Sequence, residues 1–320
     1  MKNWMKKENL LWLGLIVLSY AVLNVLISAG IINNVYQTVL MTIGINIILA
    51  ISLNLIIGIT GQFSLGHAGF MIIGAYSCGV MLKSFVSGVP GVFLGIIAGM
   101  VISALVALVV AIPTLRLRGD YLAIATLGFG EIIRIVILNM KITNGAAGLI
   151  LPKAVSWHMI FWAVVICTIV VVNFGRSAHG RACISVREDE IAAEAMGINT
   201  TQYKILAFVL GAMIASVAGA LYAGAFYVIK PDMFTYSKSI DILVLVVFGG
   251  MGSITGSFIS STLVSLLNTV LQQFSSVRMI VYGLALVVIM VFRPSGLLGR
   301  KELTFSGLLK VLKKGKGAAQ

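Results

Sequence analysis

Long apolar stretches, separated by short polar or glycine-rich segments, dominate this chain. A helix needs about 20 apolar residues to cross a hydrocarbon layer about 30 Å thick. The pattern predicts an all-α polytopic membrane protein with about ten transmembrane helices, although a count of eight or nine is also compatible. We expect these spans at residues 10–32, 36–57, 65–86, 91–112, 120–139, 157–174, 205–228, 240–250, 253–273 and 278–293.

The eighth of these stretches, residues 240–250, is too short to cross a bilayer as a helix. It ends in a glycine cluster, Gly249, Gly250 and Gly252. Irregular backbone at membrane depth persists only where protein or a water-filled cavity surrounds it. We therefore expect a broken or re-entrant element here. The five prolines all fall at proposed span ends, where the missing N–H does least harm.

Composition supports this class and limits the rest of the chain. The sequence is 59% apolar and 10% charged, whereas soluble domains average about 25% charged residues. With the spans in place, 320 residues leave no room for a large soluble domain. Any energy-supplying domain would therefore be a separate chain.

The formal net charge of +13 is distributed along the chain in a way that indicates membrane topology. Lysines and arginines precede the first span, follow the fourth, crowd residues 175–204 and follow the last span, so they share one side. The positive-inside rule makes that side the cytoplasm. We expect both termini there, with residues 301–320 as a basic cytoplasmic tail. The charge therefore indicates an orientation and gives no reason to expect nucleic acid.

The polar segment 175–204, between two apolar spans, predicts a short capped helix outside the membrane. Ser185 could cap it while Glu188 returns a bond to the cap, and Gly197 could supply the left-handed residue that ends it. A rigid charged helix between spans is typical of a surface presented to a soluble partner. An ordinary connecting loop is the alternative.

A second polar interruption lies in the segment Gly58 to Ala75. Gly61, Gln62, Ser64, Gly66 and His67 interrupt an otherwise apolar run. Broken helices in transporters often mark the substrate route, so these residues are candidates for the translocation path. A tight packing turn, whose polar side chains satisfy freed backbone groups, is the alternative.

Glu131 and Arg134 lie three residues apart on one face of the predicted span 120–139. Ionisable residues inside a membrane are costly and are functional candidates by default, so both are added to the candidate path. Alternatively, the pair neutralises itself against a neighbouring helix or subunit. Asp120 is predicted to cap the start of this span.

Small residues recur every fourth position on three spans, and we interpret these stripes as packing surfaces. They comprise Gly95, Gly99, Ser103, Ala107 and Ala111; Gly211, Ala215, Gly219 and Ala223; and Gly252, Gly256 and Ser260.

Motifs for catalysis, metal binding and ATP binding are missing from the sequence. There is no G-x-x-x-x-G-K-[ST] phosphate loop, no G-x-S-x-G elbow and no H-E-x-x-H helix. The three cysteines are far apart and match no metal-ligand spacing. We therefore expect no enzyme, no metal site and no cofactor bound by this chain.

Five segments together resemble the branched-chain amino-acid ABC importer permeases of the LivM type. They are GQFSLGHAGFMIIGAY, LRLRGDYLAIATLGFGEIIRI, REDEIAAEAMGINTTQYKILAFVLGAMIASVAGALY, VFGGMGSITGSF and FRPSGLLG. The resemblance covers nearly the whole chain, with the segments in the family's order. It implies one permease domain over residues 1–320 in a bacterial-type inner membrane.

The resemblance also implies partners and a mechanism. These are a LivH-like permease in a heterodimer, LivG-like and LivF-like ATPases that bind ATP and Mg, and an extracytoplasmic substrate-binding protein. Alternating access would follow ATP binding and hydrolysis by those ATPases. Segment 190–197 resembles the family's EAA-type loop, which makes 175–204 a coupling loop. Its candidate residues are Arg187, Glu188, Asp189, Glu190, Glu194, Ala195 and Gly197.

The resemblance makes leucine, isoleucine and valine the expected substrates. Related permeases serve urea, short amides or other amino acids, so those remain alternatives. A different class of function would be a stand-alone secondary transporter or channel in which Glu131, Arg134 and His67 relay ions. The charged loop and the scarcity of membrane carboxylates favour the importer.

Overall fold

The computed structural model describes residues 7–30, 32–115, 117, 119–271, 283–284, 287, 296–299 and 302. The predicted span 278–293 and the basic tail 301–320 therefore lie almost entirely outside the described residues. The helices are α1 (Lys7–Ser28), α2 (Asn34–Asn54), α3 (His67–Ser84), α4 (Val89–Thr114), α5 (Asp120–Asn139), α6 (Trp157–Arg176), α7 (Ala178–Glu188), α8 (Glu190–Ala195), α9 (Thr200–Ala225), α10 (Tyr236–Gly249) and α11 (Ile254–Leu271).

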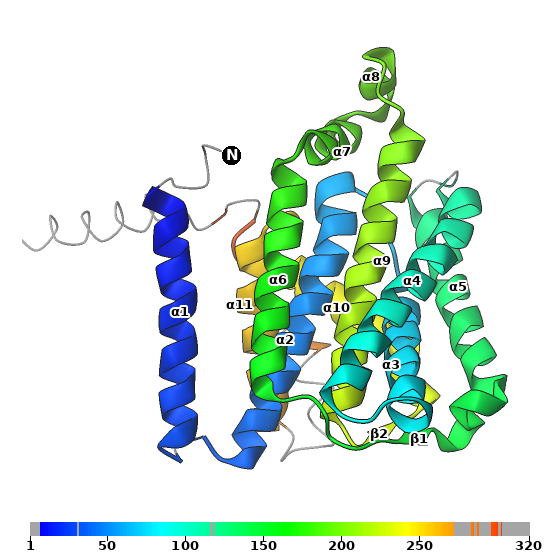
Figure 1. The fold of residues 1–320 in the computed structure, drawn as a ribbon. Coiled ribbons are helices and arrows are strands. Elements are labelled where there is room, and N and C mark those ends of the chain that lie inside the picture. Colours follow the sequence, from blue (N-terminus) through cyan, green and yellow to red (C-terminus); the bar gives the residue numbers. More distant parts are fainter. Residues whose placement is uncertain are drawn as a thin grey trace, which may run out of the picture.

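Short elements connect these helices. A turn of π-helix, η1 (Leu55–Ile59), extends α2, and 3₁₀ turns occupy Lys141–Thr143, Gly145–Ala147 and Pro231–Phe234. Two short strands, β1 (Leu149–Ile150) and β2 (Val228–Ile229), pair antiparallel with Leu149 opposite Ile229. The long helices run side by side, with α7 and α8 at one end of the bundle and the strands at the other (Figure 1). We call these the α8 end and the β end.

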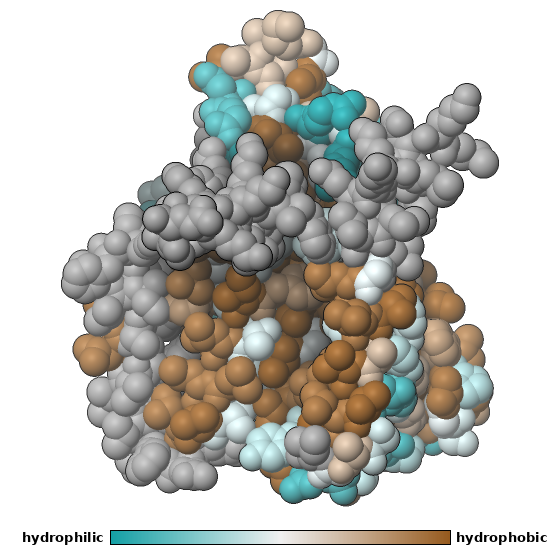
Figure 2. All heavy atoms as spheres, turned by 90° about the vertical axis from the view of Figure 1, so that its left-hand side faces the viewer, coloured by the Kyte–Doolittle hydropathy of each residue, from teal (hydrophilic) through white to brown (hydrophobic). Residues whose placement is uncertain are grey.

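The first nine predicted spans each coincide with a helix, which confirms a polytopic, essentially all-helical protein. Among the described residues, six helical segments are long and apolar enough to cross a membrane: 34–59, 89–114, 120–139, 157–176, 200–225 and 254–271. The short eighth span is confirmed as α10, whose 14 residues cover about 21 Å at 1.5 Å per residue. Gly250 and Gly252, both with positive φ, follow it. A broad apolar surface lies below the polar residues that gather towards the α8 end (Figure 2).

The small-residue stripes pack helices together, as predicted. Helix α3 lies against α4 and α9, and at the α3–α9 contact a Cβ atom on Gly74 would overlap the Ser216 carbonyl. Reciprocally, a Cβ on Gly219 would overlap the Met71 carbonyl. On α4, a Cβ on Gly95 would lie 2.5 Å from Cα of Cys78. Close backbone approach of this kind supplies dispersion contacts where lipid gives no hydrophobic drive.

The single capped helix predicted from Ser185 to Gly197 is wrong, because two helices occupy this region. Ser185 lies inside α7 and donates its hydroxyl to the Ala182 carbonyl (2.8 Å). The break falls at Asp189, whose extended backbone and carboxylate cap α8 by accepting from the N–H groups of Ile191 (2.9 Å) and Ala192 (3.0 Å). A carboxylate that satisfies two free N–H groups starts a new helix more effectively than a mid-helix serine can.

The predicted helix end at Gly197 is confirmed, whereas the predicted capping of α5 by Asp120 is wrong. Gly197 has φ +82° and ends α8, with the Ile198 N–H donating to the Ala193 carbonyl at 3.0 Å. At the start of α5, Gly119 with φ +58° holds the capping position in place of Asp120. Asp120 is the first helical residue, where its charge favours the helix dipole without capping.

Candidate functional site

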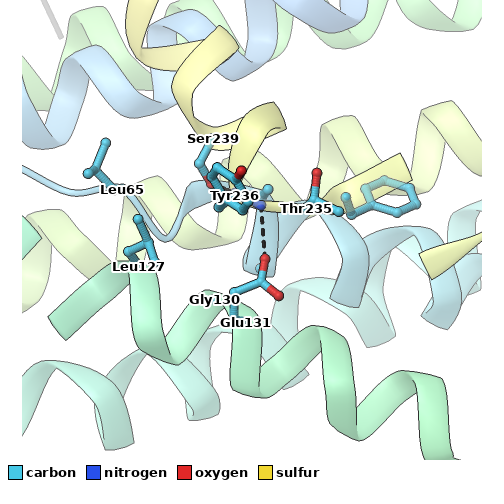
Figure 3. A pocket seen from close by; sticks show the side chains of 10 residues that line it. Leu65, Leu127, Gly130, Glu131, Thr235, Tyr236 and Ser239 are labelled. Carbon is cyan, nitrogen blue, oxygen red and sulfur yellow. Dashed lines mark hydrogen bonds between the residues drawn. The ribbon is translucent and has the colours of Figure 1, made fainter. Parts of the chain in front are cut away.

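Three elements that are remote in sequence meet in a shallow depression at membrane depth (Figure 3). They are the start of α3 with the chain before it, the middle of α5, and the start of α10. In this conformation the depression has no interior space for even a water-sized molecule, whereas typical ligand pockets enclose roughly 300–1,000 Å³. Its lining comprises Leu65, Ala68, Gly69, Leu127, Gly130, Glu131, Phe234, Thr235, Tyr236 and Ser239.

Glu131 is the charged residue of this lining, and both of its carboxylate oxygens accept hydrogen bonds. Oε2 accepts from Nε of Arg134 at 2.7 Å, and Oε1 accepts from the backbone N–H of Tyr236 at 2.9 Å, the bond drawn in Figure 3. Nη1 of Arg134 in turn lies 3.6 Å from Oδ1 of Asp232. The side chains of Glu131 and Arg134 are 24% and 18% exposed. The two charges thus neutralise each other on α5, and a role of the pair in the translocation path stays a prediction.

The hydrogen bond from the Tyr236 N–H is unusual because of where Glu131 lies. Glu131 is eight residues from Asn139, the last residue of α5, or about 12 Å at 1.5 Å per residue. Tyr236 is the first residue of α10, so that helix begins well inside the bundle. The carboxylate supplies the acceptor and the negative charge that stabilise a helix start. Glu131 is therefore the cap of a half-length helix.

The chain before α3 is fixed against α5 and α10 through backbone contacts. The Leu65 N–H donates to Oγ1 of Thr126 at 3.0 Å, and the Ala68 N–H donates to Oγ of Ser239 at 3.0 Å. A Cβ on Gly66 would overlap the Thr126 carbonyl, which explains glycine at that position. The broken element predicted here is confirmed, and tight packing holds it in place.

The polar side chains of this segment do not line the depression. Gln62, Ser64 and His67 are buried, and Nε2 of His67 lies 2.6 Å from Oγ of Ser52 on α2. Among the described residues, the Gln62 amide, the Ser64 hydroxyl and Nδ1 of His67 have no hydrogen-bond partner. Of the predicted path residues, Glu131 lines the depression, Arg134 is bonded to it and Gly66 adjoins Leu65 of the lining. Gln62, Ser64 and His67 lie outside the lining.

The charged residues of the predicted coupling loop mostly bond within the chain. Nζ of Lys204 lies 2.6 Å from Oε1 of Glu190, and the Thr200 hydroxyl donates to Oε1 of Glu194 at 2.7 Å. Asp189 caps α8, and Glu188 pairs with Arg187 at 2.6 Å. Ala195 is the last residue of α8 and is exposed. These charges build the loop and leave α8 projecting from the bundle (Figure 1).

The outermost large side chains of α8 and its C-cap are apolar, which charge-based reasoning missed. Ile191 is 73% exposed and Met196 is 82% exposed. Two large exposed apolar side chains, one on a projecting six-residue helix and one at its C-cap, are typical of a surface that a partner covers. Their presence within an otherwise polar segment was the sequence signal that could have identified them.

Within the described residues, no group of three or more His, Cys, Asp or Glu side chains could hold a metal ion. The three cysteines are buried and free of disulfides.

Comparisons with known proteins identify the family. The sequence profile described as "Branched-chain amino acid transport system / permease component" matches residues 35–291. The chain is 32% identical to the LivM permease protein of the high-affinity branched-chain amino acid transport system of Salmonella typhimurium, over 91% of this chain and 75% of that protein. The LivM protein of Escherichia coli gives the same identity and coverage.

A more distant similarity joins the chain to the other permease named in such systems. The LivH permease protein of Escherichia coli is 32% identical over 50% of this chain and 51% of that protein. No solved structure matches the chain. The family is a permease component, which confirms that the chain is not an enzyme. The profile, the LivM identities and the helical bundle together show that this chain belongs to the branched-chain amino acid ABC transport permeases of the LivM type.

Proposed function

We propose that this chain forms half of the membrane pathway of an ATP-driven importer for leucine, isoleucine and valine in a bacterial inner membrane. The other half is a LivH-like permease, and an extracytoplasmic binding protein delivers the substrate. LivG-like and LivF-like ATPases bind ATP and Mg and drive alternating access. Family membership supports this assignment, as does the lack of a phosphate loop in the sequence.

The observation that carries the proposal is the projecting, apolar-tipped α8. We propose that the α8 end faces the cytoplasm, in keeping with the basic residues of 175–204, and that residues 301–320 form a tail on the same side. Ile191 and Met196 enter a groove on an ATPase, while Asp189, Glu190 and Glu194 hold α8 in shape. Burying both apolar side chains stabilises the complex by roughly 1.5–3 kcal/mol each.

In this proposal the depression at Glu131 is the closed state of the substrate path. Opening would separate the chain before α3 from α5 and α10. The bonds from Leu65, Ala68 and Tyr236 link those elements in the present conformation. Glu131 lines the depression in the present conformation. Gly61, Gln62, Ser64, Gly66, His67 and Arg134 remain candidates for lining the path when it opens.

The docking surface can be tested with Ile191→Asp and Met196→Asp in the full complex. We expect the ATPases to co-purify with these variants at one tenth of the wild-type yield or less, while membrane insertion is unchanged. Ile150→Asp is the matched control, since Ile150 is 76% exposed at the β end. Normal ATPase co-purification with both α8 variants would refute the docking assignment.

Substrate identity needs a separate measurement. Proteoliposomes containing the complex and its binding protein should take up labelled leucine and valine in an ATP-dependent manner, with labelled urea excluded. Uptake of urea alone would reassign the substrate, and uptake without the ATPases would favour the stand-alone transporter.

A further inference from the structure

We infer that Arg187 connects the α7–α8 pair to the two glycine turns that lead into the intramembrane depression, and so transmits ATPase movement to it. This inference rests on the proposed function of α8. Arg187 lies in the last turn of α7, two residues before the Asp189 break. Its side chain reaches η1 and the glycine that follows it, at the end of α2.

The first turn joined by Arg187 is the one that follows α2. Nη1 of Arg187 donates a hydrogen bond to the carbonyl of Gly58, which lies in the π-helical turn η1. The aliphatic part of the side chain covers Gly61, where a Cβ atom would lie 3.0 Å from Cγ of Arg187. Gly61 has φ +71° and begins the non-helical chain that leads to α3. The arginine thus contacts both ends of this turn.

The second turn, between α10 and α11, packs directly on the first. A Cβ on Gly58 would lie 2.6 Å from the backbone N of Gly252. Asn54 ties the turns together, because its Oδ1 accepts from the Gly252 N–H at 2.8 Å and its Nδ2 donates to the Ser253 carbonyl at 2.9 Å. Nη1 of Arg187 would lie 3.5 Å from a Cβ on Gly252.

Each turn leads to one wall of the depression. Downstream of Gly61, the non-helical chain leads into α3, whose Ala68 and Gly69 belong to the lining. Upstream of Gly250, α10 runs back to Tyr236, which Glu131 caps. A displacement of α7 that pulls on the Gly58 carbonyl would therefore act on both walls at once. Transmission of this kind needs a fixed contact, and Glu188 holds the guanidinium through Nη2 at 2.6 Å and Nε at 3.2 Å.

The chain offers a matched control on the same helix. Arg181 is exposed, and Nη1 of Arg181 donates to the carbonyl of Arg176 at 2.9 Å. Arg181 has the same charge as Arg187 and lies on the same helix. Its hydrogen bond, however, is to a carbonyl five residues earlier in the sequence and not to one of the two glycine turns. A general effect of positive charge on α7 should therefore appear equally at both positions.

The experiment compares Arg187→Ala, Arg187→Lys and Arg181→Ala in the complete importer in proteoliposomes. Three quantities are measured: co-purification of the ATPases, ATP hydrolysis, and labelled leucine taken up per ATP hydrolysed. For Arg187→Ala we expect normal co-purification and at least half of the wild-type ATP hydrolysis, with uptake per ATP reduced five-fold or more. Arg187→Lys should recover part of this ratio, because an ammonium can still donate to the Gly58 carbonyl.

A reduction of less than five-fold for Arg187→Ala, or an equal reduction for Arg181→Ala, would overturn the inference. Loss of ATPase co-purification in Arg187→Ala would also overturn it, since Arg187 would then act in docking. If Arg187→Ala does not fold, Arg187→Lys is decisive: a ratio below wild type supports the inference, and a wild-type ratio overturns it. Failure of the α8 docking proposal is recognised separately, by normal co-purification with Ile191→Asp and Met196→Asp.

Discussion

Removing the charge of Glu131 tests whether an intramembrane carboxylate stabilises the start of α10. In Glu131→Gln, the amide oxygen can still accept from the Tyr236 N–H, but the ion pair with Arg134 is lost. In Glu131→Ala, both bonds disappear. Asp232 lies 3.6 Å from Arg134 in either case and offsets part of the loss.

The size of each effect follows from the two bonds. A hydrogen bond to a charged group contributes about 1.5–3 kcal/mol, and a negative charge at a helix start contributes about 0.3–1 kcal/mol. We therefore expect Glu131→Gln, which loses the ion pair and the charge at the helix start, to lower the free energy of unfolding by about 2–4 kcal/mol. Glu131→Ala should lower it by about a further 0.5–1.5 kcal/mol, because the hydrogen bond from Tyr236 is lost as well. Because the two side chains are 24% and 18% exposed, larger losses typical of fully buried pairs do not apply.

The assay is equilibrium unfolding in mixed micelles, followed by fluorescence of the four tryptophans. A double-mutant cycle with Arg134→Gln isolates the ion pair, and the double variant should be less destabilised than the sum of the single variants by about 1.5–3 kcal/mol. A coupling energy below about 0.5 kcal/mol would refute the stabilising role. Unchanged stability together with unchanged uptake in Glu131→Gln would reject both the structural and the functional interpretation of the pair.

Two further predictions concern the α7–α8 region. Gly197→Val forces a β-branched residue to φ +82° at a cost of about 1–2 kcal/mol, so it should impair uptake without affecting insertion. Gly128→Val, at a helical position with open space, is the control and should leave uptake unchanged. Normal uptake by Gly197→Val would exclude a coupling role. Burial raises the pKa of the Cys183 thiol to about 11, so the thiol is neutral in the folded protein and the stability it contributes falls as pH rises from about 9 to 11. Mass spectrometry should find Cys183 alkylated much more slowly at pH 8 in the intact protein than after denaturation, and equal rates would show that α7 is not docked.

The α8 region shows which features of the candidate site could be predicted from the sequence and which could not. Its place between spans and the left-handed Gly197 were predicted correctly. The choice of charged residues as the contact surface stays a prediction. What the sequence did not indicate is that Lys204 and Thr200 engage Glu190 and Glu194 within the chain. Those partners lie six to 14 residues away in sequence, and their pairing depends on how α9 returns beside α8.

The sequence by itself determined the membrane class, nine of the helices and the packing role of the glycine stripes. These properties depend on local composition and on spacing along one helix, which the chain displays directly. Only the tertiary structure decided that Glu131 caps α10, that Arg187 reaches Gly58, and that Gln62, Ser64 and His67 lie outside the lining of the depression. Each of these facts depends on segments about 60–130 residues apart or on which way a broken helix turns, and no local pattern encodes the geometry that brings them together.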